Sequence, residues 1–197
     1  MTILALDTSN KTLSVAVELT DGTIIEQTIE NTLQHSVLLM PTIEAVFKEA
    51  GITAKDLTKV VVAEGPGSYT GLRIGVTVAK TLAKSLGIPL VGVSSLDVFL
   101  PTLASKVEAG EVVVPFFDAR RGNIFAVGYK KTDEGFEKVI AEQHISWDDF
   151  VKVLPEHAAG VTFVGQLQSI TKEAIVEKGA SEAKWLEASD AIPHATS

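Results

Sequence analysis

The sequence predicts an α/β fold with two related lobes, each built on a mixed sheet flanked by helices. A strand, a helix and a strand follow one another over residues 59–93, which is the order of a crossover unit with two parallel strands. The segments LALDTSNKTLSVAV and VVPFFDARRGNIFAVGY also share one pattern: an apolar strand, an aspartate, a polar turn and a second strand. This repeat indicates two lobes, which we place at residues 1–102 and 103–197, the second being smaller.

Three strands in an antiparallel meander are expected to open the first lobe. The polar turn Thr8–Thr12 and then Gly22 interrupt successive apolar runs, as hairpin turns do. The expected strands are residues 3–6, 13–17 and 23–29.

A helix is expected over residues 34–50, because Leu39 and Ile43 belong to a series of apolar residues that recur at helical spacing. Pro41 lies inside this segment. A proline removes a backbone hydrogen bond and clashes with the preceding turn, so we expect a kink or a start nearer to Pro41. Gly51 is expected to cap the helix at its C-terminal end.

The crossover unit is expected to complete the first lobe, and further strands and helices make up the second. Gly87 ends the crossover helix, and Pro89 precedes the strand after it. The expected elements of the crossover unit are a strand at 59–63, a helix at 72–86 and a strand at 90–93. Those of the second lobe are strands at 111–117, 124–129, 135–140 and 161–164, and helices at 147–154 and 168–178.

Composition narrows the classes of function. The formal net charge is −8, whereas nucleic-acid binding draws on a basic surface that neutralises phosphates. Any link to RNA is therefore expected to run through a partner, or the charge serves solubility alone.

The chain has no cysteine, which excludes disulfides and thiolate chemistry. It shows neither a secretory leader pattern nor a long apolar run, so we expect a cytoplasmic protein without a membrane span.

Two motifs of the first lobe each have two interpretations. The turn Asp7-Thr8-Ser9 offers amides and hydroxyls that can wrap a phosphate, yet the same residues make ordinary turns. The loop from Gly65 to Gly71 precedes a helix, whose dipole favours anions. It lacks the lysine of a Walker loop and the third glycine of the Rossmann pattern. Its glycines, Gly67 among them, therefore fit close backbone packing equally well.

The helix after this loop carries small residues at successive i+4 positions, which lie on one face of a helix. Such a stripe lets another element approach closely. We predict a helix–helix interface with a second protein, and packing onto the lobe's own sheet is the alternative. The expected interface residues are Leu39, Ile43, Gly71, Gly75, Ala79 and Ala83.

Patterns that indicate catalysis are absent from the sequence. The four histidines have no HxxxH or HExxH spacing for a metal, and no G-x-S-x-G nucleophile elbow is present. We therefore expect neither a catalytic residue nor a metal site.

Four segments together resemble one family. They are DTS after the first strand, GPGSYTGLRIG with its Arg73, the following AKTLAKSLGIPLVGVSSLD, and DAR at the start of the second lobe. In this combination they resemble the TsaB (YeaZ) proteins over nearly all of residues 1–130. Such proteins usually continue past the region near Pro193, so we expect the second lobe to be shortened at its end.

The resemblance implies an actin- and hexokinase-like (ASKHA) fold and a role in making N6-threonylcarbamoyladenosine in tRNAs that read codons beginning with A. It implies pairing through the two helices of the first lobe with a catalytic paralogue, TsaD, and an ATPase, TsaE, as a third member. The chain is expected to form a homodimer when alone and to reach tRNA only through the complex. No cofactor is assigned to it. ATP or ADP is expected at the level of the complex, with a weak contact through Asp7, Thr8 and Ser9.

The resemblance also implies a pseudo-enzyme. The catalytic paralogue carries two metal-binding histidines four residues apart, in a segment that resembles GV-x-H-x-x-x-H. Here the segment Gly92–Phe99 reads GVSSLDVF and places Ser95 and Phe99 at those positions. Neither side chain can replace an imidazole as a metal ligand. The turn of the second lobe, with Asp118 and Arg120, is bulky and charged for a phosphate hairpin.

Two alternatives remain open at this point. The chain is an ATP-dependent kinase-like or glycoprotease-like enzyme of the actin-like superfamily, or it is a homodimeric nucleotide sensor. Turnover of ATP or casein that is lost on Asp7→Ala would favour the enzyme. Nucleotide binding by the isolated chain would favour the sensor.

Overall fold

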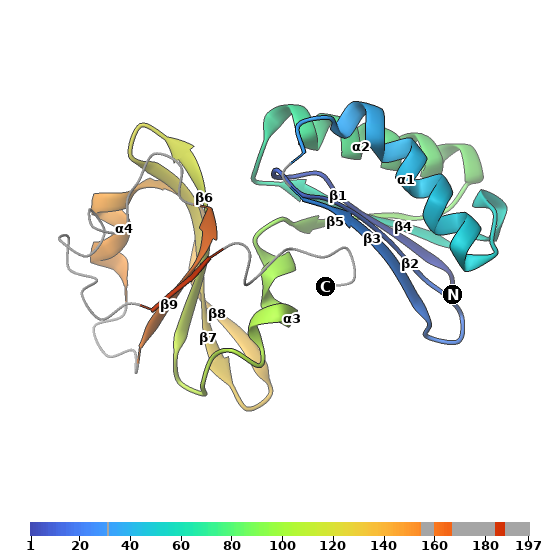
Figure 1. Cartoon of the computed structure of the whole chain (residues 1–197). Coiled ribbons are helices and arrows are strands. Elements are labelled where there is room, and N and C mark those ends of the chain that lie inside the picture. The colour runs from blue at the N-terminus through green and yellow to red at the C-terminus, as the bar shows by residue number, and fades with distance from the viewer. Residues whose placement is uncertain (31, 155–159, 167–183, 188–197) are drawn as a thin grey trace. The chain divides into compact units, whose positions relative to one another are not determined.

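The chain forms two units in a computed structural model that describes residues 1–30, 32–154, 160–166 and 184–187. The units divide between Val98 and Phe99, and each is built around its own sheet (Figure 1). The boundary expected at residue 102 lies inside the short helix α3 (Leu100–Leu103), which belongs to the second unit. We refer to the two units as the first and second lobes.

The first lobe is built on a five-stranded mixed sheet in the order β3-β2-β1-β4-β5. β2 pairs antiparallel with both β1 and β3, which confirms the predicted meander. β4 pairs parallel with β1 and with β5, which confirms the crossover unit. The strands are β1 (Ile3–Asp7), β2 (Leu13–Glu18), β3 (Ile24–Ile29), β4 (Lys59–Gly65) and β5 (Leu90–Ser94).

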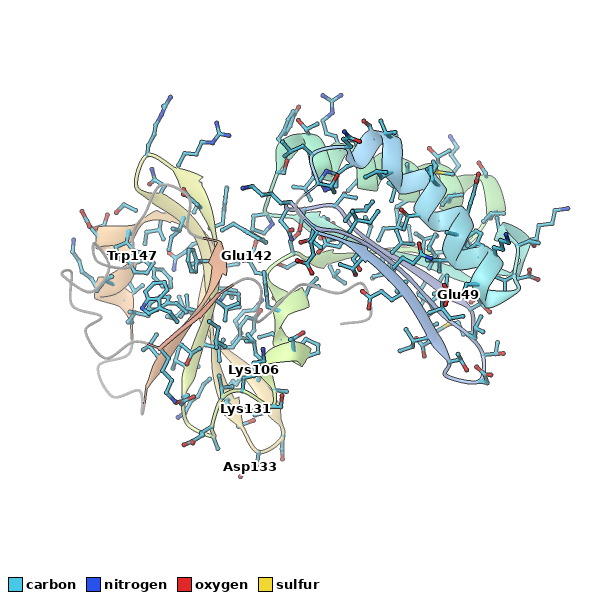
Figure 2. The ribbon with its side chains drawn as sticks, in the orientation of Figure 1. Glu49, Lys106, Lys131, Asp133, Glu142 and Trp147 are labelled. Carbon is cyan, nitrogen blue, oxygen red and sulfur yellow. The ribbon has the colours of Figure 1, made fainter. Side chains whose placement is uncertain are left out.

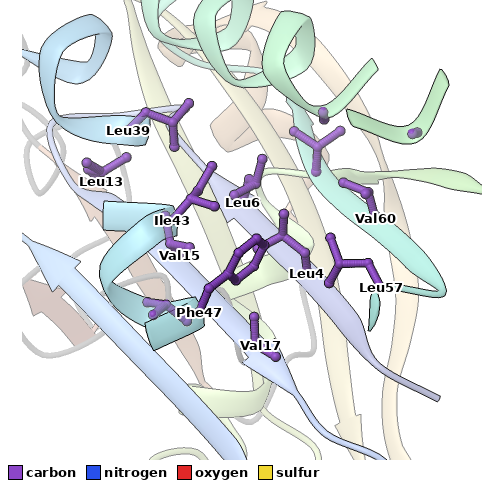
Figure 3. Close-up of a cluster of buried hydrophobic side chains, with 14 residues drawn as sticks. Leu4, Leu6, Leu13, Val15, Val17, Leu39, Ile43, Phe47, Leu57 and Val60 are labelled. Carbon is purple, nitrogen blue, oxygen red and sulfur yellow. The ribbon is translucent and has the colours of Figure 1, made fainter. Parts of the chain in front are cut away.

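Two helices, α1 (His35–Ala50) and α2 (Tyr69–Leu86), cover the same face of this sheet (Figure 1). A short 3-10 turn, η1 (Ala54–Asp56), follows α1. Alternate residues of the strands point towards the helices and form the core with residues of α1 (Figure 3). The core includes Leu4, Leu6, Leu13, Val15, Val17, Leu39, Ile43, Phe47, Leu57 and Val60.

The helix ends follow their caps, with two departures from expectation. α1 begins at His35 and runs through Pro41, which confirms the predicted helix over residues 34–50 and excludes the later start that was one of two effects expected from the proline. An internal proline costs about 3 kcal/mol, and burying Leu39 and Ile43 on either side of it offsets this with about 1.5–3 kcal/mol each. α2 begins earlier than predicted because Ser68 caps it, its hydroxyl accepting from the amide of Gly71.

Both C-terminal caps are as predicted from the sequence. Gly51 after α1 and Gly87 after α2 adopt the left-handed conformation, with φ of 67° in each case. Glycine reaches this conformation without the steric cost that a Cβ imposes, so each helix stops where its glycine stands.

The second lobe repeats the topology of the first. Its sheet runs β10-β9-β6-β7-β8, so that β6 to β10 take the places of β1 to β5 with the same parallel and antiparallel pairings. This confirms that the sequence repeat reflects two related lobes. The strands are β6 (Val112–Arg120), β7 (Asn123–Thr132), β8 (Gly135–Ser146), β9 (Val161–Gln166) and β10 (Lys184–Glu187). β10 was not predicted, and the helix predicted at 168–178 lies outside the described residues.

An aromatic cluster fills the core of the second lobe. The rings of Phe163 and Trp185 stack with centroids 4.8 Å apart, and Phe116 meets Phe163 edge to face at 6.4 Å. Trp147, the first residue of α4 (Trp147–Val153), packs onto the same cluster (Figure 2). The 3-10 turn η2 (Asp97–Phe99) precedes α3. Within the described ranges, no helix has the length and apolar content needed to cross a membrane.

Leu39 and Val37 provide a direct test of which face of α1 is the core. Leu39→Ala should lower the free energy of unfolding by about 2–5 kcal/mol, because Leu39 is buried and its truncation leaves a cavity. Val37→Ala on the exposed face of the same helix should change it by no more than about 0.5 kcal/mol. Urea unfolding of both variants measures the difference, and equal effects would contradict the assignment.

Candidate functional site

The β1–β2 hairpin is held directly against the start of α2. The Thr8 hydroxyl donates to the carbonyl oxygen of Gly71 at 2.8 Å, and the Ser68 amide donates to the carbonyl oxygen of Ser9 at 2.6 Å. Thr8 and Ser9 are fully buried. The two motifs singled out in the sequence therefore form one structural unit.

The glycines of this unit allow backbones to meet. A Cβ added to Gly75 would collide with the Thr8 hydroxyl, and one added to Gly71 would collide with the Thr8 carbonyl oxygen. At Gly67 a Cβ would collide with the carbonyl oxygen of Ser9. Of the two interpretations of the glycine loop, close packing is what these contacts show.

The six predicted interface residues lie in the core of the first lobe, which corrects their assignment. All are buried, and the small face of α2 is directed at the hairpin and the sheet. A larger side chain at Ala79 would therefore disturb the core and would not report on a partner. The residues concerned are Leu39, Ile43, Gly71, Gly75, Ala79 and Ala83.

Three buried polar atoms lie in this region without a hydrogen-bond partner among the described residues. They are Oδ2 of Asp7, Oγ of Ser9 and Nε2 of His35. The other carboxyl oxygen of Asp7, Oδ1, accepts from the Ser9 amide at 2.7 Å. Asp7 and Ser9 thus keep unmade hydrogen bonds, whereas the Thr8 side chain is committed to α2.

Burial controls the charge of Asp7. Its side chain is 2% exposed, and this desolvation raises the pKa of its carboxyl above the ordinary value, although Ser9 and His35 act in the opposite direction. A carboxyl that holds its proton more readily can donate a hydrogen bond to a bound polar group. His35 was not singled out from the sequence, because a lone histidine at a helix start has no diagnostic spacing.

The corresponding turn of the second lobe keeps one feature of this hairpin and changes the rest. The Arg120 amide donates to Oδ1 of Asp118 at 2.6 Å, as the Ser9 amide does to Asp7. However, Asp118 is half-buried and Arg120 is exposed. The shared aspartate bond shapes both turns, and only the first one buries its polar side chains.

The remaining predicted residues make other contacts. Arg73 is exposed on α2, with its guanidinium 5.5 Å from the ring centroid of Tyr69. The Ser95 hydroxyl accepts from the Gly65 amide at 3.1 Å, and the ring of Phe99 lies 5.8 Å from that of Phe117. Ser95 and Phe99 are both buried. In the part of the chain that the structure describes, no group of three or more His, Cys, Asp or Glu residues is arranged to hold a metal.

The contact between Thr8 and Gly75 predicts a rescue. Gly75→Ala should destabilise the protein by about 1–3 kcal/mol through overpacking, although alanine normally favours a helix over glycine. Adding Thr8→Ala removes the colliding hydroxyl, so the double variant should be more stable than Gly75→Ala alone. Thermal and urea unfolding measure both. A Gly75→Ala protein as stable as the wild type would contradict the packing described.

Burial of Asp7 predicts a pH dependence of stability. Because the folded state holds this proton more tightly than the unfolded chain, the carboxyl's contribution falls as pH rises from about 4, the pKa of a free aspartate, through the higher folded pKa. Asp7→Asn removes this loss. Its stability relative to the wild type should therefore increase from pH 4 to pH 7 in urea unfolding, and a constant difference would contradict the expected pKa.

Comparisons with known proteins agree with the geometry. Residues 23–187 match the family model described as TsaD, tRNA N6-adenosine threonylcarbamoyltransferase. The chain is 42% identical to the tRNA threonylcarbamoyladenosine biosynthesis protein TsaB of Bacillus subtilis, over 89% of this chain and 75% of that protein. It is 31% identical to TsaB of Escherichia coli over 68% of this chain, but the match spans only 58% of that relative.

A solved structure of a related protein is also similar to this chain. YeaZ from Pseudomonas aeruginosa superposes with a TM-score of 0.71 at 28% identity, covering 82% of this chain and 74% of that one. The resemblance drawn from the DTS, glycine-loop and DAR segments is thereby confirmed. The chain belongs to the TsaB (YeaZ) family and has its actin- and hexokinase-like fold.

Proposed function

We propose that this chain is the non-catalytic, activating partner subunit of the complex that transfers threonylcarbamoyl to N6 of adenosine in tRNAs reading codons that begin with A. The pathway is supported by the names of the matching family model and relatives. The observation that carries the partner role is a set of apolar side chains left exposed at the starts of α1 and α2, which we call the apolar surface. It consists of Leu33, Val37, Met40 and Tyr69, which are 86%, 65%, 43% and 74% exposed.

This apolar surface belongs to the two helices expected to bind the catalytic paralogue, but uses their outward faces. Val37 and Met40 lie on α1, Leu33 precedes it, and Tyr69 begins α2. The ends of both helices that carry these residues lie near the β1–β2 hairpin, since His35 acts on Asp7 electrostatically and the Ser68 amide bonds Ser9. Exposed apolar patches mark protein–protein contacts, and Tyr, Met and Arg are enriched in them.

The absence of catalysis is supported by what occupies the positions of the paralogue's histidines. Ser95 is buried and its hydroxyl is bonded to the backbone of Gly65. Phe99 is buried against another aromatic ring. Both positions serve packing, so the chain would contribute structure to the complex and leave metal chemistry to the TsaD-type subunit. A TsaE-type ATPase would join the pair, with ATP or ADP acting at that level.

Introducing negative charges on the apolar surface tests the partner role. Val37→Glu combined with Met40→Glu should weaken binding to the TsaD-type subunit at least tenfold, about 1.4 kcal/mol, because two charges would be buried without partners. Thr20→Glu in the exposed β2–β3 turn is the control and should bind normally. Calorimetry and size-exclusion chromatography measure the binding, with circular dichroism to verify the fold.

Two results would contradict the proposal or redirect it. If the double variant binds as tightly as the wild type, the apolar surface is not part of the interface. If the isolated chain is a dimer and the double variant a monomer, the same surface also pairs two copies of the chain, as the homodimer expectation requires.

A further inference from the structure

The β6–β7 turn carries two exposed arginines in a backbone conformation that arginine disfavours. Arg120 and Arg121 have φ of 69° and 53°, and no other non-glycine residue in the described ranges has a positive φ. Arg120 pairs with Asn123 across the hairpin, so Arg121 and Gly122 are the two residues of the turn itself. Both have positive φ, as in a type I′ turn.

Residues other than arginine would stabilise a turn of this kind better. Asn-Gly is preferred at its two positions, and a left-handed conformation costs most other residues roughly 1–2 kcal/mol. Arginine in the left-handed conformation at both position 120 and position 121 favours a role for the side chains, because unfavourable backbone conformations concentrate where function requires them.

The two guanidinium groups have no bonded partner in the part of the chain that the structure describes. Neither makes an ion pair or side-chain hydrogen bond with any described residue. Nearby carboxylates are engaged elsewhere: Asp118 accepts from the backbone of the turn, and Asp149 binds Lys152 at 2.7 Å as well as Ser146. Two cations without a partner among residues 1–30, 32–154, 160–166 and 184–187 therefore lie at one end of the sheet, in a chain whose net charge is −8.

A row of rings lies on the strands that enter and leave this turn and on the neighbouring strand β8. Phe117 pairs with Phe125, and Phe125 with His144, across β6, β7 and β8. The rings of Phe125 and His144 are 4.8 Å apart and tilted by 40°. Phe125 is half-buried and His144 is exposed. By strand alternation this row occupies the sheet face opposite the aromatic core.

We propose that Arg120, Arg121, Phe125 and His144 form an RNA-contact site that acts within the assembled complex. The arginines would bind backbone phosphates, for which the guanidinium fork is well suited. The ring pair would contact an unpaired nucleotide, since exposed aromatic and histidine rings on a sheet are stacking platforms for bases. An acidic protein segment would satisfy the arginines but leave the rings unused. The inference rests on the proposed function, which supplies tRNA as the substrate.

The net negative charge fits such a site as a contributor only. Two arginines cannot hold tRNA against the repulsion of an acidic chain, so the site gains effect when a partner supplies the main affinity. This agrees with the expectation that tRNA is reached through the complex.

The test variant is Arg120→Asn combined with Arg121→Asn. It removes both charges, and Arg121→Asn creates the favoured Asn-Gly turn, so thermal stability should be unchanged or higher. The matched control, Lys130→Gln with Lys138→Gln, removes two charges near the β7–β8 turn at the other end of the sheet, where Figure 2 labels Asp133. Both variants are assembled with the TsaD-type and TsaE-type subunits.

The measurement is the affinity of the assembled complex for an unmodified tRNA transcript across a salt series. The arginine variant should bind severalfold more weakly, with a salt slope smaller by about 1.4–1.8, because two phosphate contacts are lost. Phe125→Leu with His144→Ala should weaken binding without changing the slope. The lysine control should match the wild type in affinity.

The outcomes separate this inference from the proposed function. Unchanged tRNA affinity and slope in the arginine variant, in a complex that forms and modifies tRNA normally, would overturn the RNA site alone. Loss of subunit binding with normal tRNA affinity would also overturn it and make the turn a protein contact. A tRNA modification that does not require the chain at all would overturn the proposed function.

Discussion

The contact between Thr8 and the small face of α2 is the constraint on which the first lobe depends. Gly71 and Gly75 leave no room for a Cβ beside Thr8, and the Thr8 hydroxyl closes the contact with a hydrogen bond to the helix. This seats the hairpin, and with it the buried carboxyl of Asp7. It also fixes which face of α2 points inward, so the opposite face, beginning with Tyr69, is left exposed.

The two lobes share one topology but differ in their first hairpin turn. Each sheet has the same strand order, and each first hairpin is shaped by an aspartate that accepts from the amide two residues later. In the first lobe the turn is sealed by α2 and its polar groups are buried. In the second lobe the equivalent turn ends in Arg121 and Gly122 and projects its cations. The two lobes therefore share their strand topology, and the residues of the first turn determine whether each lobe buries or exposes its polar side chains there.

Much of the fold could be predicted because its signals are local. Gly22, Gly51 and Gly87 punctuate the chain, and alternating apolar residues give the strands. The start of α2 was predicted too late because the residues from Ser68 to Gly71 were assigned to the glycine loop, whereas Ser68 caps the helix. β10 was missed because a four-residue strand, KWLE, has too short a pattern to recognise.

The candidate site was harder to predict, because the decisive information is tertiary. Small residues at i+4 spacing fit an internal contact and an external one equally well, and only the collision of a Cβ on Gly75 with Thr8 decides between them. The Nε2 of His35, which has no hydrogen-bond partner among the described residues, likewise cannot be predicted from the sequence.

The central claim is that this chain activates a catalytic paralogue without doing the chemistry itself. Its most direct test is the rate at which the TsaD-type subunit forms threonylcarbamoyladenosine with and without this chain. The reaction contains the ATPase, an activated threonylcarbamoyl donor and an unmodified tRNA, and the product is measured by nucleoside mass spectrometry. We expect product only when both subunits are present and none from this chain alone. Equal rates without this chain, or product from this chain by itself, would contradict the proposed role.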